Sequence, residues 1–234
     1  NNWFRYFDLR NAEAITTSGQ LSIRWIEKSL NAYLNKILET DNKDYVVASD
    51  TDSVYITFDA LVSKVFGESP QNSKVVKFLD KVATDKLEPF INKSYKSLAD
   101  LMGAYQQKMF MAREVIADKG IWTAKKRYIL NVHNSEGVQY KEPKLKIMGI
   151  EAVKSSTPAP CREKIKEALK IIMGGNEKEL NTFIQDFRSD FMKLSPEEIG
   201  FPRSCNGLKK FTGESSLYRH GAPMHVKGAI LYNH

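Results

Sequence analysis

Two aspartates one residue apart, Asp50 and Asp52, lie in the middle of the stretch YVVASDTDSVYITF. Apolar and β-branched residues on both sides predict two short strands, Tyr45–Ala48 and Val54–Phe58, that meet at an acidic tip. Because side chains two residues apart on an extended chain point to the same side, the two carboxylates are expected to share one small volume.

Two carboxylates this close repel each other, so one must take up a proton or both must hold a cation. Oxygen ligands without histidine or cysteine favour Mg²⁺ or Mn²⁺. Magnesium held by one or two carboxylates usually completes its shell with substrate phosphates. The pattern therefore indicates phosphoryl or nucleotidyl transfer, in which two metals clamp the attacking and leaving oxygens.

The spacing of the aspartates leaves alternatives open. A polar hairpin turn without metal is the simplest, although two uncompensated carboxylates beside apolar strands are costly without a cation or partner. A DxD glycosyltransferase also holds a nucleotide-bound metal with Asp-x-Asp. A calcium loop is excluded, because Val54 and Tyr55 occupy positions where that motif needs an oxygen ligand and a glycine.

The positive charge of the chain is concentrated in one stretch. The formal net charge is +7, and residues 119–170 contain twelve Lys or Arg, five Glu and no Asp, which accounts for all of it. Such a concentration suits a polyanionic partner. A solvated basic surface without a partner is the alternative.

Within this stretch, Lys125, Lys126, Arg127 and Tyr128 are predicted to enter a strand over Ile129–Val132. Strand alternation sends Lys126 and Tyr128 to one face and the other two residues to the opposite face. Long cations beside an aromatic ring suit a nucleic-acid backbone or minor groove. Ordinary edge-strand lysines that deter aggregation are the alternative. Further cations follow: Lys144, Lys146, Lys154, Arg162, Lys164 and Lys166.

Hydrophobic periodicity assigns the elements around these residues. Residues 8–39 are predicted to form one long helix, because apolar residues recur every three or four positions. Residues 59–108 look mainly helical, with a loop near Gly67–Asn72, and Met109–Ile116 is predicted as a strand. The stretches Ile121–Val132 and Val138–Ile147 are predicted as a second hairpin. The stripe of the first helix contains Ile26, Leu30, Tyr33, Leu34, Ile37 and Leu38.

Composition changes near residue 150. A helix is predicted to start with Thr157 as N-cap and Pro158 at its first position, and to end at Gly174-Gly175. Asn176, with Glu179 three residues later, resembles a capping box that opens a second helix. We therefore expect an α+β fold, with a mixed α/β part over residues 1–150 and a mostly helical part over 151–234.

The remaining composition indicates a soluble protein of a reducing compartment. Hydrophobic residues make up 42% and charged residues 27% of the sequence, and no apolar run approaches the roughly 18 residues that span a membrane. No signal peptide is visible. Cys161 and Cys205 are isolated, which predicts neither a zinc site nor a disulfide framework. The four histidines are scattered, and the chain opens without an initiator methionine, so we expect a fragment or a split subunit.

Several motifs, in a fixed order, resemble the replicative family B DNA polymerases of T-even-type tailed bacteriophages. DTDS at 50–53 looks like the second catalytic aspartate motif of the palm, and WFRYFDLRNAEAIT at 3–16 looks like the segment after the fingers. MAREVI at 111–116, KKRY at 125–128 and EPKLKIMGIEAVKSSTP at 142–158 resemble the rest of the palm and the palm–thumb junction. MHVKGAILYN at 224–233 resembles a thumb segment. The similarity is diluted in about 60–105 and 175–222.

The resemblance implies a role for each motif. Asp52 would ligate both catalytic Mg²⁺ ions, with Asp50 beside them, and Glu114 would be an accessory acid. Residues 1–150 would form the C-terminal part of an antiparallel palm sheet with packed helices, and 151–234 an incomplete, mostly helical thumb. The residues expected to touch primer–template DNA are Lys125, Lys126, Arg127, Tyr128, Lys146, His225 and Lys227, with Lys126 in the minor groove.

The sequence also departs from the family. Ala48-Ser49 stand where the family usually has Tyr-Gly, and Ala117–Gly120 look like a shortened glycine-rich loop. The first catalytic aspartate, the fingers and the exonuclease are not in this chain. We therefore expect an N-terminal polymerase portion as partner, beside deoxynucleoside triphosphate and primer–template. The family's clamp-binding tail is also absent here, and the expected place is the cytoplasm of the infected bacterial host. A non-catalytic DNA-binding or assembly module of a polymerase complex is the alternative.

Overall fold

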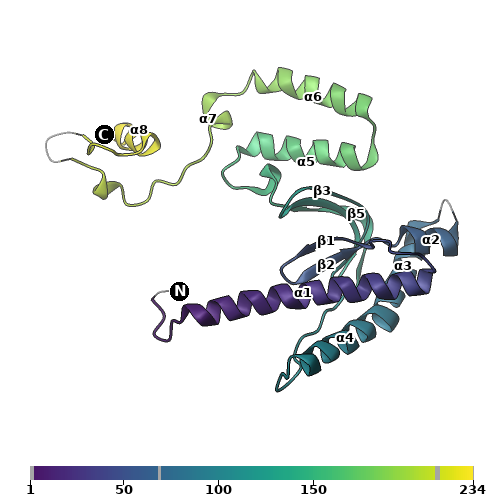
Figure 1. Ribbon diagram of the computed structural model, residues 1–234. Coiled ribbons are helices and arrows are strands. Elements are labelled where there is room, and N and C mark those ends of the chain that lie inside the picture. Colours follow the sequence, from purple (N-terminus) through teal and green to yellow (C-terminus); the bar gives the residue numbers. More distant parts are fainter. Residues whose placement is uncertain (1–2, 68–69, 214–216, 234) are drawn as a thin grey trace. The chain divides into compact units, whose positions relative to one another are not determined.

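The computed structural model describes residues 3–67, 70–213 and 217–233, and these residues form two compact units. The first unit contains the chain up to Gly120 together with Leu130–Lys146, and the second contains Ile121–Ile129 together with the chain from Ile147 onward. Packed helices and two small sheets confirm the expected α+β fold (Figure 1). The helices of the first unit are α1 (Leu9–Leu38), α2 (Asp59–Phe66), α3 (Asn72–Val82), the π-helical turn η1 (Ala83–Leu87) and α4 (Glu88–Leu101).

Helix α1 confirms the long helix predicted over 8–39. The carboxylate of Asp8 caps it by accepting a hydrogen bond of 2.9 Å from the Arg10 N–H. Of the predicted stripe, Ile26, Leu30, Leu34 and Leu38 are buried, Tyr33 is partly buried, and Ile37 remains half exposed. Burial along α1 starts only at Ser22, so the first thirteen residues of the helix contribute nothing to the core.

The core of the first unit lies between α1, α4 and a two-stranded hairpin. The rings of Tyr33 and Phe90 stack with their centroids 4.1 Å apart. The Trp25 Nε1–H donates to the Ser94 carbonyl oxygen at 3.0 Å, which ties α1 to α4 at a second point. Burying an aliphatic side chain such as Ile26 stabilises the fold by roughly 1.5–3 kcal/mol. The buried stripe of α1 therefore determines where the hairpin packs.

The hairpin consists of β1 (Val46–Asp50) and β2 (Ser53–Ile56), which pair antiparallel. It confirms the predicted strands, shifted by one or two residues toward the tip. The pairing passes from Val46 opposite Ile56 to Ala48 opposite Tyr55, so Val47 forms a bulge. A bulge bends a strand and increases its twist, and here it lies just before the acidic tip.

The second sheet has the order β3-β4-β5, with β3 at Val115–Ala124, β4 at Arg127–Ser135 and β5 at Val138–Met148. Turns of two residues join consecutive strands, so neighbours run antiparallel. The β4–β5 hairpin confirms the second predicted hairpin.

Three expectations for this sheet are wrong. The strand predicted over Met109–Ile116 starts only at Val115, and the preceding residues are irregular. The strand predicted over Ile121–Val132 is interrupted by a turn at Lys125–Lys126. Residues Ala117–Gly120, expected as a shortened loop, lie inside β3. The long strand was missed because Gly120 resembles loop composition, while ladder pairing decides its conformation.

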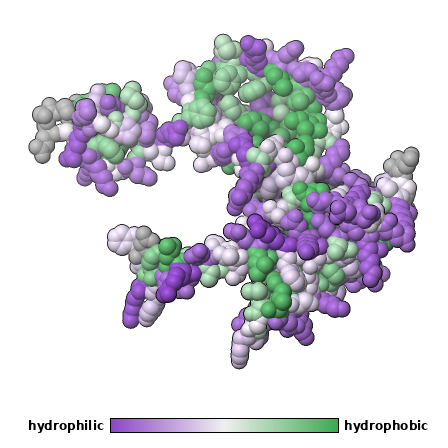
Figure 2. Space-filling model, in the orientation of Figure 1, coloured by the Kyte–Doolittle hydropathy of each residue, from purple (hydrophilic) through white to green (hydrophobic). Residues whose placement is uncertain are grey.

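The second unit contains η2 (Glu151–Val153), α5 (Ala159–Gly174), α6 (Glu177–Phe191), α7 (Pro196–Ile199), η3 (Leu208–Lys210) and α8 (Met224–Tyr232). Helix α5 starts one residue later than predicted, with Pro158 rather than Thr157 at the N-cap, and ends at Gly174 as predicted. The Asn176 side chain accepts a hydrogen bond of 3.0 Å from the Glu179 N–H, which confirms the predicted cap of α6. Figure 2 shows apolar surface over α5 and α6, where Ile172 and Ile184 remain about half exposed.

Two general expectations can be compared with the fold. Cys161 and Cys205 are both free cysteines, and each is partly buried. Within residues 3–67, 70–213 and 217–233, no helix combines the length and the hydropathy needed to cross a bilayer.

Candidate functional site

The acidic tip is a two-residue hairpin turn, Thr51–Asp52, between the paired residues Asp50 and Ser53. Thr51 has a φ of 45°, a left-handed conformation that is rare for a β-branched residue. The Asp52 N–H donates to the Asp50 carbonyl oxygen at 2.5 Å, so the chain reverses within three residues. Strain of this kind persists only where the surrounding structure enforces it, and it is frequent at functional sites.

The turn changes the geometric argument for the two carboxylates. We expected strand alternation to align them, but Thr51 is left-handed and not extended, so alternation does not apply between Asp50 and Asp52. Asp50 is partly buried and accepts a hydrogen bond of 3.1 Å from the Thr51 hydroxyl. Asp52 is exposed at the tip. The tip therefore presents carboxylate oxygens on the outer end of a partly buried hairpin.

The base of this hairpin is anchored to α1 by one asparagine. The Asn31 Oδ1 accepts hydrogen bonds from the N–H groups of Tyr45, at 2.8 Å, and Val46, at 3.1 Å. The Tyr45 ring is fully buried, and its hydroxyl lies 2.8 Å from the Thr40 Oγ1. Four residues further along α1, Asn35 holds the preceding loop, donating to the Lys43 carbonyl oxygen at 2.7 Å.

These two asparagines were not among the residues predicted to matter for the site. Their signal is a pair of polar residues at i and i+4 beside the apolar stripe of α1, a spacing that places them on one helix face. Because such residues usually face solvent, the pattern alone does not distinguish an anchor from an exposed polar pair. Here they fix the base of the acidic hairpin while leaving its tip open.

The donor atoms at the acidic tip are of the type that binds magnesium. Two carboxylates and no nitrogen or sulfur ligand are the donors that Mg²⁺ prefers, with waters and substrate phosphates completing its shell. In the part of the chain that the structure describes, no three His, Cys, Asp or Glu side chains gather closely enough to hold an ion. Asp50 and Asp52 are thus suited to one side of a metal site rather than to a closed protein cage.

Glu114 and Lys146, predicted separately as accessory acid and phosphate ligand, are brought together by the structure. The Lys146 Nζ and a Glu114 carboxylate oxygen form an ion pair between the start of β3 and the end of β5. The Glu114 carbonyl oxygen also accepts a hydrogen bond of 2.7 Å from the Glu136 N–H. Both side chains keep access to solvent, with the Glu114 side chain 53% exposed and the Lys146 side chain 27%.

Arg113 was not singled out by the sequence, yet it links three elements of the first unit, α3, α4 and β4. Its guanidinium forms an ion pair with Asp80 of α3 and donates to the Asn134 Oδ1 of β4 at 2.7 Å. Its N–H donates to the Glu88 Oε1 at 3.1 Å. Since Glu114 follows directly, Arg113 fixes the backbone from which that carboxylate projects.

The basic residues lie at the β3–β4 turn and not along one strand. Lys125 and Lys126 form the turn, and Lys126 has a φ of 60°. The predicted alternation of the four side chains is therefore wrong, because a turn separates the lysines from β4. Tyr128 follows inside β4 with only 7% of its surface exposed, its ring 6.3 Å from that of Trp122.

Arg127 is held by an acid of the second unit. Its Nη2 donates to the Glu151 Oε2 at 2.6 Å, and the Lys154 Nζ donates to the Glu151 Oε1 at 2.9 Å. Hydrogen bonds from Lys154, from the backbone and from Arg127 lower the pKa of Glu151 from 4.5 to about 2. The carboxylate is therefore ionised at every pH at which a protein of this kind would work.

The two predicted residues of the last helix lie in α8. His225 is exposed, and its carbonyl oxygen accepts a weak hydrogen bond of 3.6 Å from the Cys205 thiol. The Lys227 Nζ lies 5.0 Å from the centre of the Tyr218 ring. Their predicted contact with DNA, like that of the residues above, stays a prediction.

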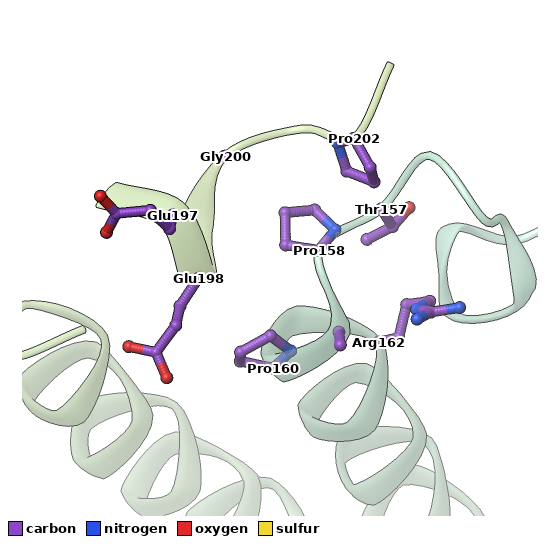
Figure 3. A pocket seen from close by; sticks show the side chains of 9 residues that line it. Thr157, Pro158, Pro160, Arg162, Glu197, Glu198, Gly200 and Pro202 are labelled. Carbon is purple, nitrogen blue, oxygen red and sulfur yellow. The ribbon is translucent and has the colours of Figure 1, made fainter. Parts of the chain in front are cut away.

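A cavity of about 400 Å³ lies between the start of α5 and α7 (Figure 3). Prolines contribute much of its wall, together with Glu197 and Glu198 from α7 and Arg162 from α5. The Ser195 N–H donates to the Glu198 Oε2 at 2.9 Å, which engages one of these carboxylates in the capping of α7. None of the predicted site residues lines this cavity.

An α+β fold with an acidic two-residue tip and a separate basic turn offers the donor groups of an enzyme that acts on nucleic-acid phosphates. Two curated proteins are similar to the chain over essentially its whole length, and both are DNA-directed DNA polymerases. The polymerase of Escherichia phage RB69 is 41% identical over 243 residues, which cover all of this chain and 27% of that protein. The polymerase of Enterobacteria phage T4 is 36% identical over 241 residues, covering 99% of this chain and 27% of that protein.

The resemblance to the DNA polymerases of T-even-type phages is therefore confirmed. The chain spans about a quarter of the length of these curated relatives. No protein-family model matches it. Because both relatives are polymerases, the glycosyltransferase alternative gains no support from them.

Proposed function

We propose that this chain is a palm-and-thumb portion of a phage replicative DNA polymerase and takes part in template-directed nucleotidyl transfer. The observation that carries the proposal is the similarity of the whole chain to two DNA-directed DNA polymerases, at 41% and 36% identity. The acidic tip and the basic turn supply the two kinds of group that such a reaction needs, metal ligands and a grip on phosphate.

In this proposal Asp52, with Asp50 beside it, supplies one carboxylate side of a two-magnesium site. When bound, magnesium would lower the pKa of the primer 3′-hydroxyl and neutralise charge that develops on the phosphates. The exposed tip leaves room for a deoxynucleoside triphosphate and for carboxylates from elsewhere in the polymerase. Asn31 and Tyr45 keep the hairpin base rigid, so that the aspartates hold their position when those ligands arrive.

The cationic residues hold the nucleic acid. Lys125, Lys126 and Lys146 contact phosphates or the minor groove of the primer–template, and Arg127 and Tyr128 support the lysines from β4. Glu114 acts as an accessory acid whose charge is balanced by Lys146 until DNA is bound. His225 and Lys227 extend the grip from α8.

The partner that completes the site is the remainder of a polymerase, which would supply the first catalytic aspartate, the fingers and the exonuclease. The exposed apolar residues at the start of the described chain favour such a partner: Trp3 is 95% exposed, and Leu9 and Ile15 are each about 70% exposed. Covering such exposed apolar side chains with a partner would remove their surface from water, which is favourable. A sliding clamp is a further proposed partner, and the cytoplasm of the infected host is the proposed place of action.

Replacement of one carboxylate tests the function. In a polymerase that contains this chain, Asp52→Ala should reduce primer extension by roughly a thousandfold or more, because a lost metal ligand removes several kcal/mol of transition-state stabilisation. Asp41→Asn, an exposed aspartate of the preceding turn, is the matched control and should leave the rate unchanged. Unchanged extension by the Asp52 variant would instead support a non-catalytic DNA-binding or assembly module.

Duplex binding by the purified chain tests the grip separately. About four phosphate contacts predict a slope of roughly −3 to −4 for log K against log salt concentration, because each contact releases counterions. Fluorescence anisotropy of a labelled duplex at several salt concentrations measures this slope. Binding that does not change with salt would contradict the assignment.

A further inference from the structure

The Lys125–Lys126 turn rests on a neighbouring stretch of backbone at Gly149. Gly149 has a φ of 67°, and a Cβ placed there would lie 2.1 Å from the Lys126 carbonyl oxygen and 3.2 Å from the Arg127 Cγ. No side chain fits in that space without moving the turn. Only glycine provides both the left-handed backbone and the close approach.

Glu151, two residues further on, holds the same turn through its charge. Its carboxylate accepts hydrogen bonds from Arg127, at 2.6 Å, and from Lys154, at 2.9 Å. The Arg127 and Glu151 side chains are 39% and 45% exposed, so the pair lies at the surface beside the turn. Gly149 thus contacts the second residue of the turn, Lys126, through the backbone, and Glu151 contacts the next residue, Arg127 at the start of β4, through its side chain.

The location of Glu151 is electrostatically unfavourable for a DNA grip. It is one of only five acids among the 52 residues from 119 to 170, and an ionised carboxylate there repels phosphate. If charge alone determined binding, its removal would strengthen the grip. Its two short hydrogen bonds to cations instead indicate that its contribution is geometric.

We propose that Gly149 and Glu151 are positioning residues of the nucleic-acid grip, which hold the Lys125–Lys126 turn in the conformation that engages the phosphates of a DNA duplex. This inference rests on the proposed function and adds to it two residues that touch no nucleic acid themselves. Arg127 in turn acts mainly through Glu151, because one edge of its guanidinium is already engaged there.

The test compares two variants that change the charge equally. Glu163 also binds a lysine, Lys166, at 2.9 Å, but on the outer surface of α5 and away from the turn in sequence. Glu163→Gln removes one negative charge and should bind duplex DNA equally or slightly more tightly. Glu151→Gln removes the same charge and should bind roughly three- to tenfold more weakly, with a salt slope shallower by about 1 to 2, because phosphate contacts are lost.

A second pair of variants tests the backbone contact. Gly149→Ala introduces the Cβ that collides with the Lys126 carbonyl oxygen, and it should weaken binding in the same way. Gly137→Ala is the matched control: Gly137 also has a positive φ, of 85°, but a Cβ there meets nothing within 4 Å. It should strain the backbone without changing the DNA affinity or its salt slope. Circular dichroism of each variant verifies that the fold is kept.

The outcomes are separable. Tighter binding by Glu151→Gln, equal to that of Glu163→Gln, would overturn the inference while leaving the proposed function intact. Equal salt slopes for the Gly149 and Gly137 variants would overturn the role of Gly149. If the unmodified chain binds no duplex at any salt concentration, the proposed grip itself is wrong, and its positioning residues are wrong with it.

Discussion

The acidic tip and the basic turn have similar local backbone structure, but neighbouring residues support them at different places. Each is a two-residue hairpin turn without glycine, and each contains one residue at positive φ, Thr51 at 45° and Lys126 at 60°. The third hairpin turn, Glu136–Gly137, has the glycine that such turns usually require. The two turns that carry the candidate chemistry therefore depart from ordinary turn composition, and the one without a proposed role follows it.

The difference lies in where support is applied. Asn31 holds the acidic hairpin at its base, so that its tip is open for ligands. Gly149 and Glu151 hold the basic turn at the turn itself. A metal-binding tip needs space on several sides for ligands. A phosphate-binding turn instead needs its cations held in one fixed position. The following predictions test this contrast, from the largest expected effect to the smallest.

Asn31→Ala should destabilise the first unit strongly. The N–H of Tyr45 loses its acceptor in a fully buried setting and that of Val46 loses one of two, which together cost roughly 2–3 kcal/mol. Chemical denaturation measures the change in the free energy of unfolding. Lys28→Ala, at an exposed position of the same helix, should change it by less than about 0.5 kcal/mol. Equal losses of stability in the two variants would show that Asn31 does not anchor the hairpin.

Gly137→Ala should be intermediate. An L-residue at a φ of 85° is strained by roughly 1–2 kcal/mol, and no neighbouring atom adds a clash. Thermal unfolding should show this loss, while the DNA affinity remains that of the parent chain. If Gly137→Ala lost more unfolding free energy than Asn31→Ala, the hydrogen bonds of Asn31 would not be the larger contribution to stability.

Acid should weaken the support of the basic turn, because that support includes the ionised carboxylate of Glu151. The pKa of Glu151 is lowered to about 2 in the fold, so its stabilising contribution is complete above its ordinary pKa of 4.5 and is lost as the pH falls through 2. The difference in stability between the parent chain and Glu151→Gln should therefore shrink between pH 5 and pH 2. Urea titrations at several pH values measure this difference, and a constant difference would contradict the assigned ion pair.

Thr51→Gly should have the smallest effect on stability. Glycine relieves the strain at a φ of 45° but increases the entropy of the unfolded chain, so a net gain of about 0.5 kcal/mol or less is expected. Primer extension by a polymerase that contains the variant should nevertheless fall, because the two aspartates become less restrained. Extension at the parental rate would show that the tip does not need its strained turn.

The sequence allowed much of the fold to be predicted where local pattern and tertiary packing agree. The stripe of α1 was predicted because Ile26, Leu30 and Leu34 repeat at helical spacing and are buried together. The turn at Glu136–Gly137 was predicted because it contains a residue suited to positive φ. The acidic hairpin was predicted from apolar flanks around two aspartates.

The failures occur where tertiary contacts override local pattern. Lys125–Lys126 contains no turn residue, and the chain reverses there against Gly149 and Glu151, more than twenty residues further along the sequence. In the sequence, Arg113 cannot be distinguished from an ordinary surface arginine, because only the fold brings Asp80 and Asn134 to its side chain. Single residues with distant partners leave no periodic signal, so neither the turn nor this link could be recognised from spacing.

The uneven burial of α1 has a kinetic consequence. From Leu9 to Leu21 the helix has no buried residue, and a helical segment of that length is marginal in water without packing. Amide hydrogens there should exchange with solvent quickly, while those from Ser22 onward are released only when the core opens. A single continuous helix would thus show two exchange regimes. A partner that covers its first half would be detected by slower exchange at those amides alone.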